Sequence, residues 1–129
     1  MAITVTWDNE SKTIIRYVYE GHWTITDFNL AYAESRTLLD EVDHTVHFIV
    51  DIRASHLLPN GALSRGRTIA NSPHVNEGRT AIVGASPVIR AILDVFRRLH
   101  GKKFDETKFI LVSGLDVARS KLLGDANGP

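Results

Sequence analysis

The feature that most constrains the fold is an apolar pattern that switches along the chain between a period of two and a period of about 3.6 residues. Residues 3–7 and 13–20 alternate apolar and polar side chains, which predicts two half-buried strands joined as an antiparallel hairpin. Residues 28–42 then repeat apolar side chains at helical spacing, after Thr24 and Asp27 in the arrangement of a capping box. The chain is therefore expected to begin with two strands and a helix.

The rest of the chain continues as alternating strands and helices. Strands are expected at 46–51, 80–83 and 108–112, and helices at 62–71, 87–99 and 115–122. Because each helix must cross back over the sheet to reach the next strand, the order ββαβαβαβα predicts an α/β fold with a five-stranded, mixed but mostly parallel sheet and four helices. One domain is expected over 1–124, with a frayed tail at 125–129.

Charge and composition narrow the function classes. Fifteen basic residues balance fifteen acidic residues, so net charge favours neither nucleic acid nor an anionic membrane as a partner. The absence of cysteine excludes disulfides, thiolate nucleophiles and cysteine-bound zinc. The first residues lack the pattern of a secretion signal, and no run approaches the roughly 20 apolar residues of a membrane span. We therefore expect a cytoplasmic protein with no membrane span.

The segments that carry a family likeness lie at strand ends and helix starts. They are Gly21, Thr26 with Asp27, Phe-Ile-Val-Asp at 48–51, Ala-Ile-Val-Gly at 81–84, Ser86 with Pro87, and the run 109–122. Together they resemble the STAS-type superfamily, and within it a bacterial subgroup similar to the sporulation anti-sigma-factor antagonist. The resemblance implies a STAS-like fold and a module that binds or regulates a protein partner.

The switch that controls the regulatory members of that family is missing here. In those proteins a serine in an Asp-Ser-Ser-Gly-like stretch at the start of the second helix is phosphorylated. Pro59, Asn60 and Gly61 occupy the corresponding stretch of this chain, and neither asparagine nor glycine can carry a phosphate. Ser55 and Ser64 lie nearby but out of register. The resemblance therefore supports the fold and argues against a phosphorylation switch.

The predicted binding site lies after the central strand, because open α/β sheets tend to bind ligands beyond the carboxyl ends of their strands. A protein partner, or a second copy of the chain in a homodimer, is expected to contact this loop and the second helix, at 62–71. The predicted contact residues are Asp51, Arg53, Ser55, His56, Leu57, Leu58, Asn60, Gly61, Leu63, Gly84 and Ser86. A structural alternative for Asp51 is a carboxylate that caps a helix or accepts loop N–H groups.

Other functions receive less support from the residues. A small apolar ligand or lipid is the main alternative, since related folds hold such molecules between sheet and helices. It would need a pocket lined by residues such as Tyr17, Tyr19, Phe28, Leu57 and Leu58. An enzyme using Asp51 and His56 would lack a third, orienting group. A helix start such as the turn from Gly84 to Pro87 can bind an anion, but almost every helix presents the same N–H groups.

The six histidines do not indicate a metal site. His44 and His47 are three residues apart at a strand start, which places their side chains on opposite faces. His56 and His74 flank a loop and are expected to be solvated, because no cysteine or paired glutamate accompanies them. The basic residues at 97–103 lack the interleaved aromatic side chains of a nucleic-acid surface. We therefore predict a protein that is not an enzyme, with no catalytic residue, metal or cofactor.

Overall fold

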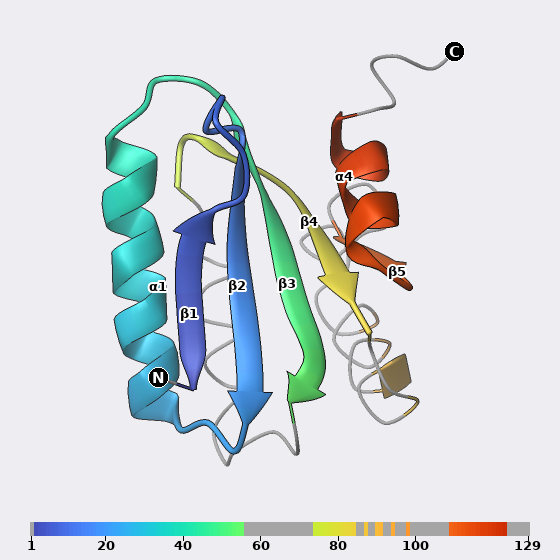
Figure 1. The fold of residues 1–129 in the computed structure, drawn as a ribbon. Coiled ribbons are helices and arrows are strands. Elements are labelled where there is room, and N and C mark those ends of the chain that lie inside the picture. Colours follow the sequence, from blue (N-terminus) through green and yellow to red (C-terminus); the bar gives the residue numbers. More distant parts are fainter. Residues whose placement is uncertain are drawn as a thin grey trace.

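Five strands and two helices form the fold of the described residues in the computed structural model (Figure 1). The structure describes residues 2–55, 74–84 and 109–123, together with Pro87, Arg90, Ala91, Asp94 and Arg98. The strands are β1 (Ile3–Trp7), β2 (Ile14–Gly21), β3 (Val46–Ser55), β4 (Glu77–Val83) and β5 (Phe109–Val112). The helices are α1 (Ile25–Asp40) and α4 (Leu115–Leu123).

The strand order in the sheet is β1-β2-β3-β4-β5. β1 and β2 pair antiparallel, and every later neighbour is parallel. The predicted α/β fold with a five-stranded, mostly parallel sheet is therefore confirmed. Of the four predicted helices, α1 and α4 are shown; the one at 62–71 lies outside the described residues, and the five described positions within 87–99 are helical. β3 continues to Ser55, beyond its predicted end at Asp51.

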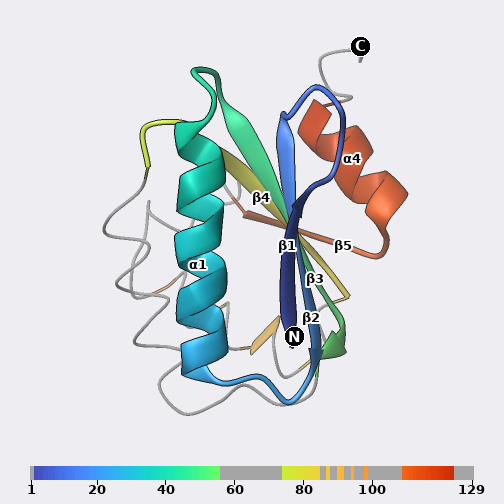
Figure 2. The same ribbon diagram turned by 60° about the vertical axis from the view of Figure 1, so that its left-hand side comes forward.

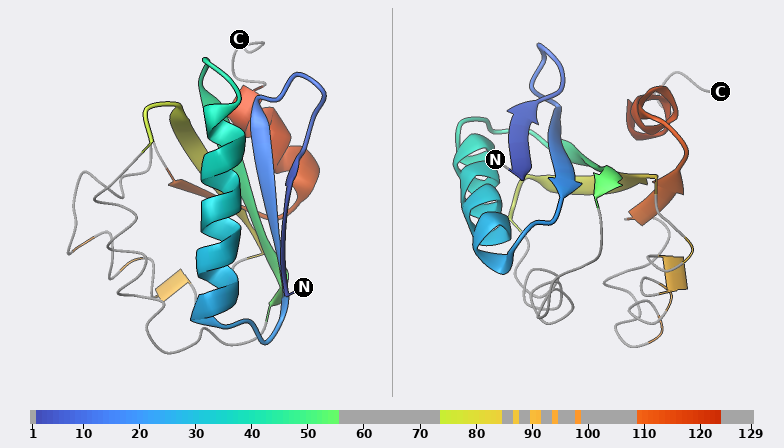
Figure 3. Two further views of the ribbon diagram at one scale, coloured as in Figure 1. Left: turned by 90° about the vertical axis from the view of Figure 1, so that its left-hand side faces the viewer. Right: turned by 60° about the horizontal axis from the view of Figure 1, so that its bottom comes forward.

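The sheet separates two apolar layers. On one face Ile3, Val5, Ile15, Tyr17, Tyr19, Val46 and Phe48 pack with Ala31 and Leu39 of α1. On the other face Ile14, Ile49, Ala81, Val83 and Val112 pack with Ala118 and Leu122 of α4. Figures 2 and 3 show the two helices on opposite sides of the sheet. The alternation of apolar side chains along the strands thus supplies both layers.

The predicted capping box begins α1. Thr24 Oγ1 accepts the backbone N–H of Asp27 at 3.0 Å, and the Asp27 carboxylate accepts the backbone N–H of Thr24 at 3.0 Å. The residues that α1 buries recur every four positions, as expected for one helix face: Ala31, Ser35 and Leu39. The helix lies along the β1 side of the sheet (Figures 1 and 2).

The C-terminal end of α1 is fastened to the start of β4. Asn76 Nδ2 donates to the carbonyl oxygens of Leu39 at 3.0 Å and Val42 at 2.9 Å, which lie at the end of the helix and just beyond it. His74 Nδ1 accepts the Asn76 N–H at 3.0 Å, so its Nε2 carries the proton and donates to the Asp40 carboxylate at 2.7 Å. These side chains join the helix to the sheet.

A bulge in β4 is filled by a side chain of β3. The register between the two strands shifts between Val46 and Phe48, where β4 has one residue more than β3. The Arg79 N–H donates to His47 Nδ1 at 2.9 Å. A Cβ on Gly78 would lie 2.5 Å from that ring nitrogen, so glycine permits the close approach. Burial and the nearby Arg79 charge lower the pKa of His47, which favours the neutral ring that accepts this bond.

Candidate functional site

Asp51 and Arg53, the charged residues of the predicted site, form an ion pair on the face of the sheet that carries α4. Asp51 lies between Val18 of β2 and Val83 of β4 and is only 7% exposed. Arg53 donates from Nε to Asp51 Oδ1 at 2.9 Å and from Nη2 to Oδ2 at 2.8 Å. These bonds lower the pKa of Asp51 despite its burial, so the carboxylate is ionised at neutral pH.

The same carboxylate fills a second bulge, near the end of β3. The register between β2 and β3 shifts between Val18 and Glu20, where β3 has one residue more than β2. The Arg53 backbone N–H donates to Asp51 Oδ1 at 3.1 Å. A shift of one residue turns the side chains that follow to the opposite face. Asp51 therefore accepts a backbone N–H, as its structural alternative predicted.

Ser55 consequently points away from the ion pair. Its Oγ accepts the Nε1–H of Trp23 at 2.9 Å, and Trp23 belongs to the apolar layer under α1. The structure thus brings Asp51 and Arg53 together and places Ser55 on the other side of the sheet.

The Gly84 backbone lies directly against the Arg53 side chain. It has a positive φ of 83°, and a Cβ at this position would lie 2.3 Å from Arg53 Cγ, so only glycine fits without displacement. The Gly84 N–H donates to the Val112 carbonyl at 3.2 Å and is therefore occupied by the link to β5. The anion-binding interpretation loses this donor, and Ser86 lies outside the described residues.

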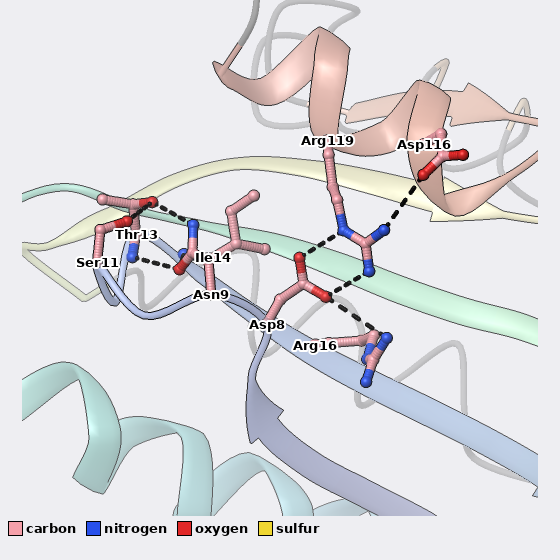
Figure 4. Close-up of polar contacts among 8 residues, drawn as sticks. All are labelled: Asp8, Asn9, Ser11, Thr13, Ile14, Arg16, Asp116 and Arg119. Atoms are coloured by element: carbon pink, nitrogen blue, oxygen red, sulfur yellow. Dashed lines mark hydrogen bonds and ion pairs between the residues drawn. The ribbon is translucent and has the colours of Figure 1, made fainter.

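A second ion-pair cluster, which the sequence did not reveal, links α4 to the turn between β1 and β2 (Figure 4). Arg119 donates from Nε to Asp8 Oδ2 at 2.8 Å and from Nη2 to Oδ1 at 2.9 Å. Arg16 Nη1 lies 3.5 Å from Asp8 Oδ1, and the Asp8 side chain is 2% exposed. The hydrogen bonds from Arg119 lower the pKa of Asp8 most strongly, in opposition to its burial. Asp116 on the first turn of α4 lies 3.4 Å from Arg119 Nη1.

The turn that carries Asp8 is held by an asparagine. Asn9 Oδ1 accepts the backbone N–H groups of Thr13 at 3.0 Å and Ile14 at 3.3 Å, and Asn9 Nδ2 donates to Thr13 Oγ1 at 2.7 Å (Figure 4). Lys12 completes the turn in a left-handed conformation with φ 56°. These contacts fix the turn between β1 and β2 and so position Asp8 opposite α4.

Next to α4, part of this sheet face has no helix over it among the described elements. α4 packs on β3, β4 and β5 and also on Ile14 at the start of β2. Beyond Ile14, no described helix lies over β1 and β2 on this side (Figure 3). We call this surface the open strip; its side chains are partly or fully exposed and belong to Thr4, Thr6, Val18, Glu20 and Ala54. Arg16 and Arg53 lie on the same face, with 31% and 49% of their side chains exposed.

The remaining predicted contacts, His56, Leu57, Leu58, Asn60, Gly61 and Leu63, lie outside the described residues. The two alternatives therefore stay hypotheses: an enzyme that uses Asp51 with His56, and an apolar-ligand pocket. Of its lining residues, Tyr17 and Tyr19 are buried with ring centroids 6.2 Å apart. Tyr19 also meets Trp23 edge to face at 5.0 Å, so these rings fill the space between them.

Three of the described histidines, His44, His47 and His74, each serve a local contact. His44 Nε2 donates to the Lys12 carbonyl at 2.9 Å, while His47 and His74 hold the bulge and the helix end already described. Within residues 2–55, 74–84 and 109–123, no three histidine, aspartate or glutamate side chains gather as a metal ion would require.

Comparison with known proteins gave no match: no protein family and no curated protein sequence matches this chain. The likeness to STAS-type domains therefore rests on the segments quoted from the sequence. In the part of the chain that the structure describes, neither helix has the length and apolar character needed to cross a bilayer.

Proposed function

We propose that this chain is a non-enzymatic, STAS-like protein-interaction module that binds its partner on the open strip. The observation that carries the proposal is the part of the sheet face beside α4 that no described helix covers. There Thr4, Thr6 and Ala54 present small exposed side chains on regular strands, and two half-exposed arginines lie beside them. Arginine is enriched at protein interfaces, where its planar group bonds carboxylate and carbonyl oxygens.

The carboxylates next to the strip are suited to hold arginines and not to transfer protons. A general acid or base near neutral pH needs a pKa close to that pH, whereas the pKa values of Asp8 and Asp51 are lowered. Both oxygens of each group also accept arginine N–H groups at 2.8–2.9 Å. Asp51 and Asp8 therefore position Arg53 and Arg119.

The surface is fixed before a partner arrives. Asp51 holds the β3 bulge through the Arg53 N–H, and the Arg119–Asp8 pair joins α4 to the β1–β2 turn. A surface that is already ordered loses less conformational entropy on binding. This rigidity favours recognition by a partner that adapts its own shape to the strip.

The proposal is tested by blocking the strip with bulk. One variant carries Thr4→Tyr and Ala54→Tyr, at two exposed strip positions; its matched control carries Asn29→Tyr and Ala33→Tyr, at two exposed positions of α1. Tagged wild-type protein, strip variant and control are each used to capture partners from cell extract, and circular dichroism checks that all three are folded. We expect a protein that the wild type and the control retain and that the strip variant loses. Equal capture by the strip variant would refute this binding surface.

A further inference from the structure

Few buried carboxylates serve the arginines around the open strip. Three arginines, Arg16, Arg53 and Arg119, lie against two buried carboxylates, Asp8 and Asp51. Asp116 is the further acidic contact of Arg119, and its side chain is fully exposed, so water screens most of its charge. These three arginines therefore share two buried carboxylates, one fewer than their own number.

Arg16 is the cation left with the weakest partner. Its closest carboxylate contact is 3.5 Å from Nη1 to Asp8 Oδ1, and Asp8 already accepts two shorter bonds from Arg119. Arg16 Nε is buried and has no hydrogen-bond partner, and no other buried side-chain nitrogen or oxygen of the described residues shares that state. A buried donor without a partner leaves the guanidinium incompletely satisfied, and an added acceptor can reach this side chain through the 31% of it that is exposed.

A ligand on the strip has access to this arginine. Thr6 pairs with Arg16 across β1 and β2, and its side chain is exposed. On the other flank, Arg53 uses Nε and Nη2 for Asp51 and is half exposed. Val18 and Asp51 are register partners on β2 and β3, so the two arginines flank one patch of the sheet.

We propose that the partner places a single carboxylate, from an aspartate or a glutamate, on the open strip against Arg16, with Arg53 beside it. The inference rests on the proposed function and names the chemistry of its partner. One carboxylate would give Arg16 the close ionised partner that it lacks, since the nearest atom of Asp8 lies 3.5 Å away. A phosphorylated side chain carries close to two negative charges and would also face Glu20, which is exposed on the same face; a partner protein with an acidic side chain is therefore favoured over a phosphorylated one.

The test follows the arginine Nε–H signals by ¹H–¹⁵N NMR spectroscopy. The probe is a short capped peptide with one central glutamate, and its control is the same peptide with glutamine. We expect the glutamate peptide to shift the Arg16 signal in a saturable way below about 10 mM, and the glutamine peptide to leave it unchanged. Arg16→Gln should weaken binding about tenfold or more, because a charge-assisted bond is lost. Arg36→Gln, on α1 at the opposite face, should not weaken it.

We call the proposed contact between the partner's carboxylate and Arg16 the acidic anchor. Equal binding of both peptides would overturn it, and so would unchanged peptide binding by the Arg16→Gln variant. The absence of a saturable shift would also overturn it. Arg16→Lys checks the geometry, because it keeps the charge and loses the planar fork, and it should retain only part of the affinity. If the strip variant with Thr4→Tyr and Ala54→Tyr loses its partner while the peptides do not discriminate, the binding surface stands and the acidic anchor fails. If that variant keeps its partner, the proposed function itself fails.

Discussion

The contact between Asp8 and Arg119 joins residues separated by 111 positions. It gives the clearest test of the long-range packing in this fold. Replacing Asp8 with asparagine keeps the size of the side chain and removes its charge. Arg119 then loses an ionised partner for two bonds of 2.8 and 2.9 Å, and Arg16 loses its nearby carboxylate. We therefore expect Asp8→Asn to destabilise the fold through both arginines.

The expected magnitude follows from burial. Breaking a fully buried ion pair costs about 3–5 kcal/mol, and an exposed pair contributes about 0–1 kcal/mol. Asp8 is 2% exposed and Arg119 is 38% exposed, which places this pair between the two limits. We expect Asp8→Asn to lower the free energy of unfolding by about 2–3 kcal/mol, and a double-mutant cycle with Arg119→Gln to give a coupling energy of about 1–2 kcal/mol.

Urea unfolding followed by circular dichroism measures the four free energies of the cycle. A coupling energy below about 0.5 kcal/mol would show that the two side chains act independently and would refute the reasoning.

The pH dependence of the unfolding free energy supplies a second check. The pKa of Asp8 is lowered in the folded chain, so its stabilisation is complete above the unfolded value of about 4 and is lost as the pH falls through the folded value. The difference between wild type and Asp8→Asn should therefore shrink in acid.

Two further predictions concern the glycine under Arg53 and the histidine in the β4 bulge. Gly84→Ala should cost about 2–4 kcal/mol of unfolding free energy, because left-handed strain adds to a clash with the Arg53 side chain. Gly21→Ala has a similar φ of 60° with open space around it and should cost only about 1–2 kcal/mol in the same urea assay; equal losses would contradict the clash. His47 should titrate below about pH 6.5 in the folded chain by NMR, since its pKa is lowered. The unfolded chain then takes up a proton first, so this contribution to stability is present above pH 6.5 and is lost as the pH falls; a pKa at or above 6.5 would contradict the neutral acceptor.

The sheet and its first helix were predictable because apolar spacing reports directly on burial. Ile3 and Val5 alternate with exposed threonines, and Thr24 with Asp27 forms the predicted cap. The two bulges were not predictable, because a pattern of period two carries no signal for an extra residue. Each arises where a β3 side chain, His47 or Asp51, accepts a backbone N–H.

The candidate site was predictable only in part, because the sequence carries no signal for the bulge near the end of β3. Asp51 and Arg53 follow an apolar run at the expected end of the central strand, and the structure brings them together over Gly84. Ser55 was assigned to the same site, but the bulge turns it toward Trp23. The Asp8–Arg119 pair depends on how α4 packs across the sheet, which no local pattern contains.

The position of α1 beside β1 also bears on how the chain behaves at high concentration. β1 has the sequence ITVTW and contains neither a charged residue nor a proline. Outer strands commonly use such residues to prevent pairing with strands of other molecules. Here a docked helix, seated on Ile3 and Val5 through Ala31 and Leu39, takes over that protective role. Resistance to aggregation therefore depends on the stability of α1, and loosening its Thr24 cap would uncover a strand that can recruit further chains.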